Sequence, residues 1–230
     1  MSNRKRSLNR VSRADIPVRL FILESPGPLD ALEGRAEGPA LSQISKLIGH
    51  QVVTFPIISA SQFDDCCDYI STITDYEDTV ADTPICIHIS AHGLEDGTGL
   101  CFGGNEVPWT ELMDSLLPIF RKNMAGPLIL VLSACNANRQ QLTRAIEKHI
   151  EKESEISPPK YVFCSIESVP WSDAAVGWTV FYHLLPGVDL ENRDQVKDTL
   201  KKIKSIGLPK IWYYRWDLRR KEYFRYENKG

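Results

Sequence analysis

The sequence predicts an α/β fold in which helices flank a mostly parallel sheet. Two short aliphatic runs, residues 85–89 and 128–132, each follow a proline and are typical of strands that are buried on both faces of such a sheet. Apolar residues recur at helical spacing in the segments between the predicted strands. A chain of 230 residues, of which 43% are hydrophobic and 25% charged, can bury a sizeable core.

The first part of the chain alternates strands with helices. The stretch SPGP at residues 25–28 predicts a loop, because its prolines lack amide donors and its glycine is flexible. Gly49 ends the first predicted helix, and Ser61 with Asp64 forms a weak capping-box variant at the start of the second. The predicted order is strand, helix, strand, helix and strand, at residues 18–23, 38–48, 51–57, 61–70 and 85–89.

The second part begins with a small hairpin over residues 100–109, which projects from the sheet edge. Thr110 is a candidate N-cap for the helix that follows, and Ser172 with Asp173 forms a candidate cap for a later helix. The remaining elements are strand, helix, strand, two helices and two strands, at residues 128–132, 138–150, 161–166, 172–184, 195–206, 211–214 and 223–226.

Two reactive side chains stand just beyond the ends of predicted strands. His92 follows the run at residues 85–89, and Cys135 follows the run at residues 128–132. In open α/β sheets the chemistry gathers at the carboxyl ends of the strands, where loops meet helix starts. We therefore expect His92 and Cys135, which are 43 positions apart, to form a Cys-His active site at one edge of the sheet.

The residues around these two can supply what a nucleophilic thiol needs. A helix that begins shortly after Cys135 would lower the pKa of the thiol and direct backbone N–H groups toward it. Gly93 has no side chain, so its N–H can approach a substrate carbonyl closely. Taken alone, a cysteine after an apolar strand is usually a core thiol and a His-Gly pair is usually a turn. The joint placement of His92, Gly93 and Cys135 favours the active site.

Three motifs carry a resemblance to a known family. They are HISAHG at residues 88–93, LVLSACN at residues 130–136, and VPWSDAA at residues 169–175 followed by FYHLL at residues 181–185. In this order the motifs resemble those of the CHAT family of caspase-like cysteine peptidases. The resemblance covers roughly residues 19–185 and includes the predicted hairpin.

The resemblance implies a caspase-like α/β fold of the caspase-hemoglobinase type and hydrolysis of a peptide bond within a protein substrate. Cys135 would be the nucleophile of this thiol protease, and His92 the general acid or base. The backbone amides of Gly93 and Cys135 would form the oxyanion hole. By that family's mechanism no metal or organic cofactor is expected.

The same resemblance bears on partners and biological context. We expect regulation by a protein partner or by self-assembly. Many bacterial members act in defence or cell-death pathways, so a role in defence, including antiviral defence, is a further expectation.

The nucleophile motif departs from the familiar caspase pattern, because Cys135 stands in SACN rather than in a Gln-Ala-Cys-Arg-Gly type motif. A preference for aspartate is therefore not carried over. Relatives that cut after basic residues often carry an acidic residue two places before the nucleophile, where this chain has Ser133. Asp173 or Glu167 could line a pocket for a basic side chain, although Asp173 could instead cap a helix. Trp171 is either a pocket wall, by the resemblance, or a residue that packs at a helix start.

Other hypotheses stay open beside the peptidase. The domain could be catalytically silent and act as a protein-binding module, although the intact catalytic motifs argue against this. His88 and Cys86 could imitate part of a zinc site, but no matching ligand set is apparent, so we expect His88 to be a buried, hydrogen-bonded core residue. The sequence has no Gly-x-Ser-x-Gly elbow, phosphate-binding loop or dinucleotide fingerprint.

Composition sets the remaining expectations. A net charge of −3 argues against direct nucleic-acid binding, except through a basic tail at residues 1–16 that we expect to be disordered. We expect residues 17–230 to form a single domain. The sequence shows no secretory signal or membrane-spanning stretch, which predicts a cytoplasmic protein without a membrane partner. Apart from Cys135, the cysteines are expected to be unpaired structural thiols.

Overall fold

The computed structural model describes residues 17–73, 83–122, 126–135, 141–153, 155–165, 168–208 and 210–226. The main path of its sheet runs in the order β2 (Gln51–Pro56), β1 (Arg19–Ser25), β3 (Ile85–Gly93), β6 (Leu128–Ser133), β7 (Tyr161–Ser165), β8 (Ile211–Asp217) and β9 (Glu222–Tyr226). A hairpin of β4 (Gly99–Phe102) and β5 (Asn105–Pro108) pairs with the end of β3. Strands β2 to β7 on the main path are parallel, whereas β8 and β9 are antiparallel to their neighbours. The predicted mostly parallel α/β sheet is confirmed.

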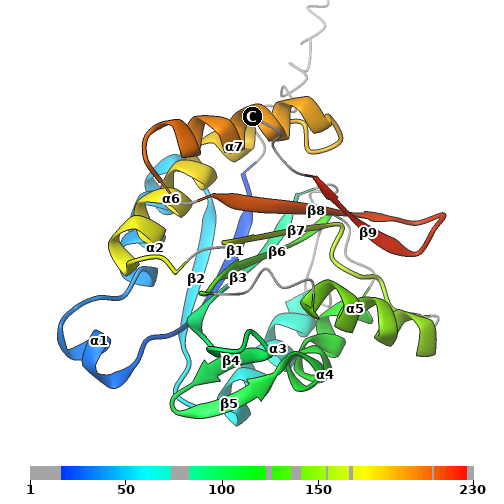
Figure 1. Cartoon of the computed structure of the whole chain (residues 1–230), viewed down its shortest axis with the longest axis horizontal. Helices are drawn as coiled ribbons and strands as arrows, with labels where there is room; N and C mark the ends of the chain where they lie inside the picture. The colour runs from blue at the N-terminus through cyan, green and yellow to red at the C-terminus, as the bar shows by residue number, and fades with distance from the viewer. Residues whose placement is uncertain are drawn as a thin grey trace, which may run out of the picture.

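Helices cover both faces of this sheet, as Figure 1 shows. Helices α2 (Gly38–Ile48), α6 (Trp171–Leu184) and α7 (Arg193–Ser205) pack on one face, and α3 (Ala60–Ser71), α4 (Trp109–Phe120) and α5 (Gln141–Lys152) pack on the other. Successive strand residues point to opposite faces. On β3, Ile87 and Ile89 therefore belong to the core under α3 and α4, whereas Cys86 belongs to the core under α2 and α6. None of the described helices is both long and apolar enough to cross a membrane.

Two strands are longer than the sequence predicted, because antiparallel partners extend them. The strand predicted to end at Ile89 continues to Gly93, since β4 pairs Cys101 with His92 and Leu100 with Gly93. In the same way β8 continues to residue 217, where the turn into β9 begins. The local apolar runs did not reach the strand ends, where the residues are polar, small or only partly buried.

Three helices begin directly after a proline or with one. Helix α4 starts at Trp109 after Pro108, and α6 starts at Trp171 after Pro170, with no side-chain cap in either case. Pro28 opens the short helix α1 (Pro28–Leu32) within the stretch that was predicted to be a loop. Proline is favoured at such positions because its backbone angle suits a helix start and no amide donor is needed there. The predicted caps are wrong, because these residues lie inside the helices: Thr110, Ser172 and Asp173.

The caps of α3 and α7 are side-chain oxygens at other positions. Ser59 caps α3 by accepting the amide of Gln62 at 3.2 Å, so the predicted capping box of Ser61 and Asp64 is wrong. Asn192 caps α7, which begins at residue 193 rather than 195. The predicted start of α5 near residue 138 and the basic tail at residues 1–16 lie outside the described residues.

His88 is fully buried in the middle of β3. Its Nδ1 lies 2.8 Å from the hydroxyl of Tyr182 on α6, and its Nε2 lies 2.9 Å from a carboxylate oxygen of Glu37, which precedes α2. The Tyr182 hydroxyl also lies 3.5 Å from the Sγ atom of Cys86. The prediction of a buried, hydrogen-bonded core histidine is confirmed. These contacts join β3 to α6 and to the residue that precedes α2.

A second buried carboxylate holds the start of α2. Glu24, near the end of β1, accepts the amide of Gly38 at 2.6 Å. A Cβ atom at position 38 would lie 2.4 Å from Oε2 of Glu24, so glycine is required for this close approach. Burial raises the pKa of Glu24, and the amide hydrogen bonds from Gly38 and Glu37 offset part of that rise.

The raised pKa of Glu24 makes a prediction about stability and pH. A carboxyl whose folded pKa lies above its unfolded value of about 4.5 stabilises the folded state at low pH, and this contribution is lost as the pH rises through the folded pKa. Relative to Glu24→Gln, the wild type should therefore lose unfolding free energy as the pH rises from about 4 to 7. Urea denaturation at several pH values measures this. A pH-independent difference between the wild type and Glu24→Gln would contradict the assignment.

Candidate active site

The register of two neighbouring strands brings His92 and Cys135 to the same level of the sheet. Strands β3 and β6 pair in parallel from Ile85 with Leu128 through Ser90 with Ser133, a constant offset of 43 positions. His92 and Cys135 are separated by the same 43 positions, so each lies two residues beyond the last pair. Neighbouring strands are about 4.8 Å apart. His92 and Cys135 therefore lie at the same level of two neighbouring chain segments, at the carboxyl edge of the sheet.

Gly93 allows the two strand ends to approach each other. A Cβ atom at this position would lie only 1.8 Å from the carbonyl oxygen of Cys135. The amide of Leu94 donates to the carbonyl of Gly99, which belongs to β4. Because alternate amides in an antiparallel pair point to the same partner, the N–H of Gly93 points away from β4 and toward the side of β6.

A cavity of about 230 Å³ opens at this edge. Its lining includes four residues that the sequence had nominated: His92, Ser133, Cys135 and Trp171. The other described lining residues are small or aliphatic: Ala91, Ala134, Ser165, Ser168, Val169 and Ala174. Apart from the imidazole and the thiol, the described lining is uncharged. The cavity therefore offers a reactive pair beside a small neutral pocket.

Asp30 is the partner of His92, and the sequence did not predict this role. Its Oδ2 lies 2.7 Å from Nε2 of His92, and the side chains are 14% and 47% exposed respectively. Asp30 comes from α1, which follows the end of β1 at the same edge of the sheet. A Cβ atom at Gly27 would lie 3.1 Å from Oδ2 of Asp30 and 3.2 Å from Nε2 of His92, so the glycine leaves room for the pair.

Two further side chains hold the Asp30 carboxylate. Partial desolvation acts to raise the pKa of Asp30, but hydrogen bonds from His92 and Trp171 and the charge of Arg35 bring it below its usual value. The guanidinium Nε of Arg35 lies 3.4 Å from Oδ1 of Asp30. The indole ring of Trp171 also packs edge-on against the imidazole, with ring centroids 5.4 Å apart. Trp171 therefore contacts both members of the pair while it lines the cavity.

The thiol of Cys135 is half-buried and donates a hydrogen bond to the hydroxyl of Ser168 at 3.6 Å. All six cysteines are free. Burial raises the pKa of Cys86 and of Cys164 to about 12, which suppresses their thiolates. Burial also raises the pKa of Cys66, and it raises that of Cys67 further. Among the described residues that line the cavity, Cys135 is the cysteine.

The remaining nominated pocket residues have other positions. Asp173 is not among the described residues that line the cavity; its carboxylate lies 3.4 Å from the hydroxyl of Ser172 in the first turn of α6. Glu167 and Asn136 lie outside the described residues. The sequence signal that could have revealed Asp30 was its place shortly after the first strand, at the edge that also carries His92.

No protein-family model and no curated protein sequence matches the chain. Solved structures do match its fold. The crystal structure of the caspase drICE superposes with a TM-score of 0.51 at 11% identity, covering 85% of this chain and 86% of the drICE chain. The chain has a caspase-like fold. The secreted C11 cysteine protease iotapain from Bacteroides thetaiotaomicron also has this fold, with a TM-score of 0.51 at 9% identity over 87% of this chain and 67% of its own. At these identities the similarity establishes the fold alone.

The close approach of Gly93 to the backbone of Cys135 leads to a prediction about stability. Gly93→Ala places a Cβ atom against the backbone of Cys135, which cannot move aside without separating the two strand ends. We expect a loss of more than about 2 kcal/mol of unfolding free energy in urea denaturation. Gly177→Ala is the matched control, because a Cβ atom there meets nothing and alanine favours its helix by about 0.5–1 kcal/mol. Equal stability of the two variants would show that the close approach is absent.

Proposed function

We propose that this protein is a cysteine endopeptidase that cleaves a protein substrate with a Cys135-His92 dyad. The observation that carries the proposal is the placement of His92 and Cys135 in one cavity at the carboxyl edge of a caspase-like sheet. The caspase-like fold supports a peptidase, because the two solved structures that share it are a caspase and a C11 cysteine protease. The finer assignment to the CHAT type rests on the sequence motifs.

The proposed reaction uses the thiol and the imidazole in turn. The proton of the Cys135 thiol passes to His92, and the thiolate sulfur attacks the carbonyl carbon of the scissile peptide bond. The C–N bond then breaks as the imidazolium donates its proton to the leaving amine. Water, deprotonated by His92, hydrolyses the resulting thioester and releases the acid. The thiol and the imidazole return to their starting states.

Backbone amides supply the electrostatic part of this mechanism. The developing oxyanion needs N–H donors that are already in place. The amide of Gly93, which points toward the side of β6, is one proposed donor, and the amide of Cys135 is the other. Ser133 and Trp171, which line the cavity, are proposed to contact the substrate residue before the cut.

Asp30 is proposed as the positioning residue for His92. If the neutral imidazole carries its proton on Nε2, that N–H donates to Asp30 and leaves Nδ1 to accept the thiol proton. The carboxylate then stabilises the imidazolium as it forms. Because its pKa lies below the usual value, Asp30 stays ionised across the neutral range.

The biological setting is proposed from the family resemblance. We propose a cytoplasmic enzyme whose activity is controlled by a protein partner or by self-assembly, and which takes part in bacterial defence or cell death. Residues 17–230 are proposed to form its single domain, and no metal or organic cofactor takes part in the mechanism.

One observation favours the alternative of a silent, protein-binding domain. The hydrogen bond of the Cys135 thiol goes to Ser168, and the Nε2 of His92 is engaged by Asp30. In peptidases of this type, however, the thiol and the imidazole can lie apart until the substrate arrives. The peptidase and the binding module differ in whether the biological effect requires the Cys135 thiol.

The experiment that tests the proposed function maps new protein N-termini by mass spectrometry. Cells that express the wild type are compared with cells that express Cys135→Ala, because removal of the sulfur abolishes the nucleophile. We expect new termini in the wild type alone, and the sequences around them define the substrate and the preferred residue. An unchanged biological effect of Cys135→Ala, without wild-type-specific termini, favours the binding module.

The contact between Asp30 and His92 makes a kinetic prediction. Asp30→Asn keeps the size of the side chain but removes its charge, so kcat on the mapped substrate should fall about 10- to 100-fold. KM should change less than about threefold, since Asp30 is not in the described lining of the cavity. Arg35→Gln, which removes a neighbour of Asp30 but leaves its carboxylate, is the control and should retain most activity. A full-rate Asp30→Asn enzyme would contradict the positioning role.

A further inference from the structure

The last part of the chain has a charge opposite to that of the rest. Residues 193–226 contain eleven lysine and arginine residues against four aspartate and glutamate residues, although the whole chain has a net charge of −3. These residues form α7 and the β8–β9 hairpin. Such asymmetry points to an acidic partner for this region rather than to a general property of the surface.

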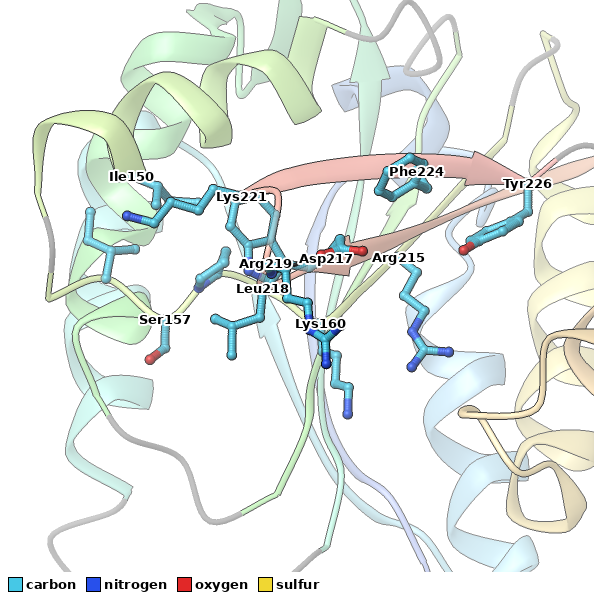
Figure 2. Close-up of a pocket in the computed structure, with 13 residues that line it drawn as sticks. Ile150, Ser157, Lys160, Arg215, Asp217, Leu218, Arg219, Lys221, Phe224 and Tyr226 are labelled. Atoms are coloured by element: carbon cyan, nitrogen blue, oxygen red, sulfur yellow. Dashed lines mark hydrogen bonds between the residues drawn. The ribbon is translucent and has the colours of Figure 1, made fainter.

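A cavity lies against this hairpin. Its volume is about 810 Å³, and we call it the hairpin pocket. Its lining includes Ile150, Ile156, Lys160, Trp216, Arg219 and Lys221. Figure 2 shows Lys221 and Ile150 near one end of the pocket and Phe224 and Tyr226 near the other, with Lys160 and Arg219 between them.

The hairpin pocket combines an apolar part with a basic part. Ile150 and Ile156 are 9% and 7% exposed and form an apolar floor together with Pro158 and Trp216. The charged lining contains four cations and one carboxylate: Lys160, Arg215, Arg219, Lys221 and Asp217. A ligand that fills the pocket must therefore present both apolar and negatively charged groups.

Two of the four cations are already neutralised within the protein. Glu191 forms ion pairs with both Lys160 and Arg215 and accepts the hydroxyl of Tyr161 at 2.8 Å. Within the described part of the chain neither Arg219 nor Lys221 forms an ion pair with a carboxylate inside the pocket, although the charge of Asp217 acts on Arg219. These two therefore carry the unbalanced positive charge at the pocket.

The turn that presents Arg219 is preorganised. One carboxylate oxygen of Asp217 accepts the amides of Arg219 at 2.8 Å and Arg220 at 3.0 Å, so the acid is used by the turn rather than by a ligand. Lys221 closes the turn with a φ of 54°, the left-handed conformation that a tight turn needs. Leu218 is left 81% exposed at the tip, beside the pocket. A rigid turn loses little conformational freedom when a partner binds.

We propose that the hairpin pocket binds an extended acidic segment of a partner protein that inserts an aliphatic or aromatic side chain. The apolar floor fits the inserted side chain, and Arg219 and Lys221 fit flanking carboxylates. A nucleic acid fits less well, because its bases need open aromatic faces. Here Arg220 already covers Phe224 at 5.1 Å and Arg193 covers Tyr226 at 4.4 Å from the ring centroids.

This docking site lies apart from the catalytic cavity. Lys160 precedes the first residue of β7, whereas Ser165 at the other end of β7 lines the cavity with Cys135. A five-residue strand separates them by about 16 Å. A partner segment can occupy the hairpin pocket while the catalytic cavity stays open. The site does not depend on the proposed peptidase activity, so binding can be measured on the Cys135→Ala protein.

The test is fluorescence polarisation with a labelled peptide of about twelve residues, mostly Glu and Asp, with a central Leu-Phe pair. We expect saturable binding to Cys135→Ala, and a loss of at least about tenfold in affinity when R219E and K221E are added. The matched control adds K202E and K204E on α7, which makes the same change in charge at exposed positions away from the pocket. That control should bind within about twofold of the parent protein. A peptide with Ser-Ser in place of Leu-Phe should bind at least about fivefold more weakly.

Several results overturn the proposal. They are no binding of the peptide up to about 1 mM, or an equal loss in the R219E/K221E and K202E/K204E proteins, which indicates only general electrostatic attraction. Tighter binding of a single-stranded RNA of similar length, with the same dependence on Arg219 and Lys221, would assign the site to nucleic acid. Self-association that R219E and K221E abolish, seen by analytical ultracentrifugation without peptide, would assign it to a second copy of the chain.

Discussion

The parallel pairing of β3 with β6 is the constraint on which the site depends. Side-chain direction alternates along a strand, so a slip of one residue would turn His92 or Cys135 to the opposite face of the sheet. The slip is prevented because both strands are buried on both faces, with aliphatic side chains packed under helices on either side. On one face His88 adds directional contacts to Tyr182 and Glu37 that no shifted register could keep. Packing of the core thus fixes the positions of His92 and Cys135 relative to each other along the strand direction.

The side chains that contact the imidazole come from helices rather than from the central strands. Asp30 lies on a five-residue helix, and Trp171 is the first residue of α6. Both contact His92, which is half exposed, whereas the strand that carries His92 is almost fully buried before it. The site therefore combines an imidazole on a buried strand with a carboxylate from α1 and an indole from α6.

The fold could be predicted from the sequence largely because its central strands are buried. Continuous aliphatic runs, such as residues 128–132, have few alternatives to a central strand, and a reactive side chain after such a run falls at the functional edge. Helix starts were harder to predict from the sequence, because Pro108 and Pro170 precede α4 and α6 where side-chain caps were expected. For Asp30 the sequence offered only its place shortly after the first strand, which many loop carboxylates share. Its role depends on how α1 folds back toward β3, and this is a property of the tertiary structure.

The pattern of thiol burial has a consequence for covalent labelling. The four cysteines whose pKa is raised by burial react slowly with electrophiles at neutral pH, because the thiolate is the attacking form. Cys101 and Cys135 are half-buried, as is Cys66, whereas Cys67, Cys86 and Cys164 are buried. Cys101 pairs directly with His92 across β3 and β4, and Cys135 follows the strand on the other side of β3. A fluorescent label on either Cys101 or Cys135 would therefore lie next to the strand that carries His92, and its fluorescence would report on that neighbourhood.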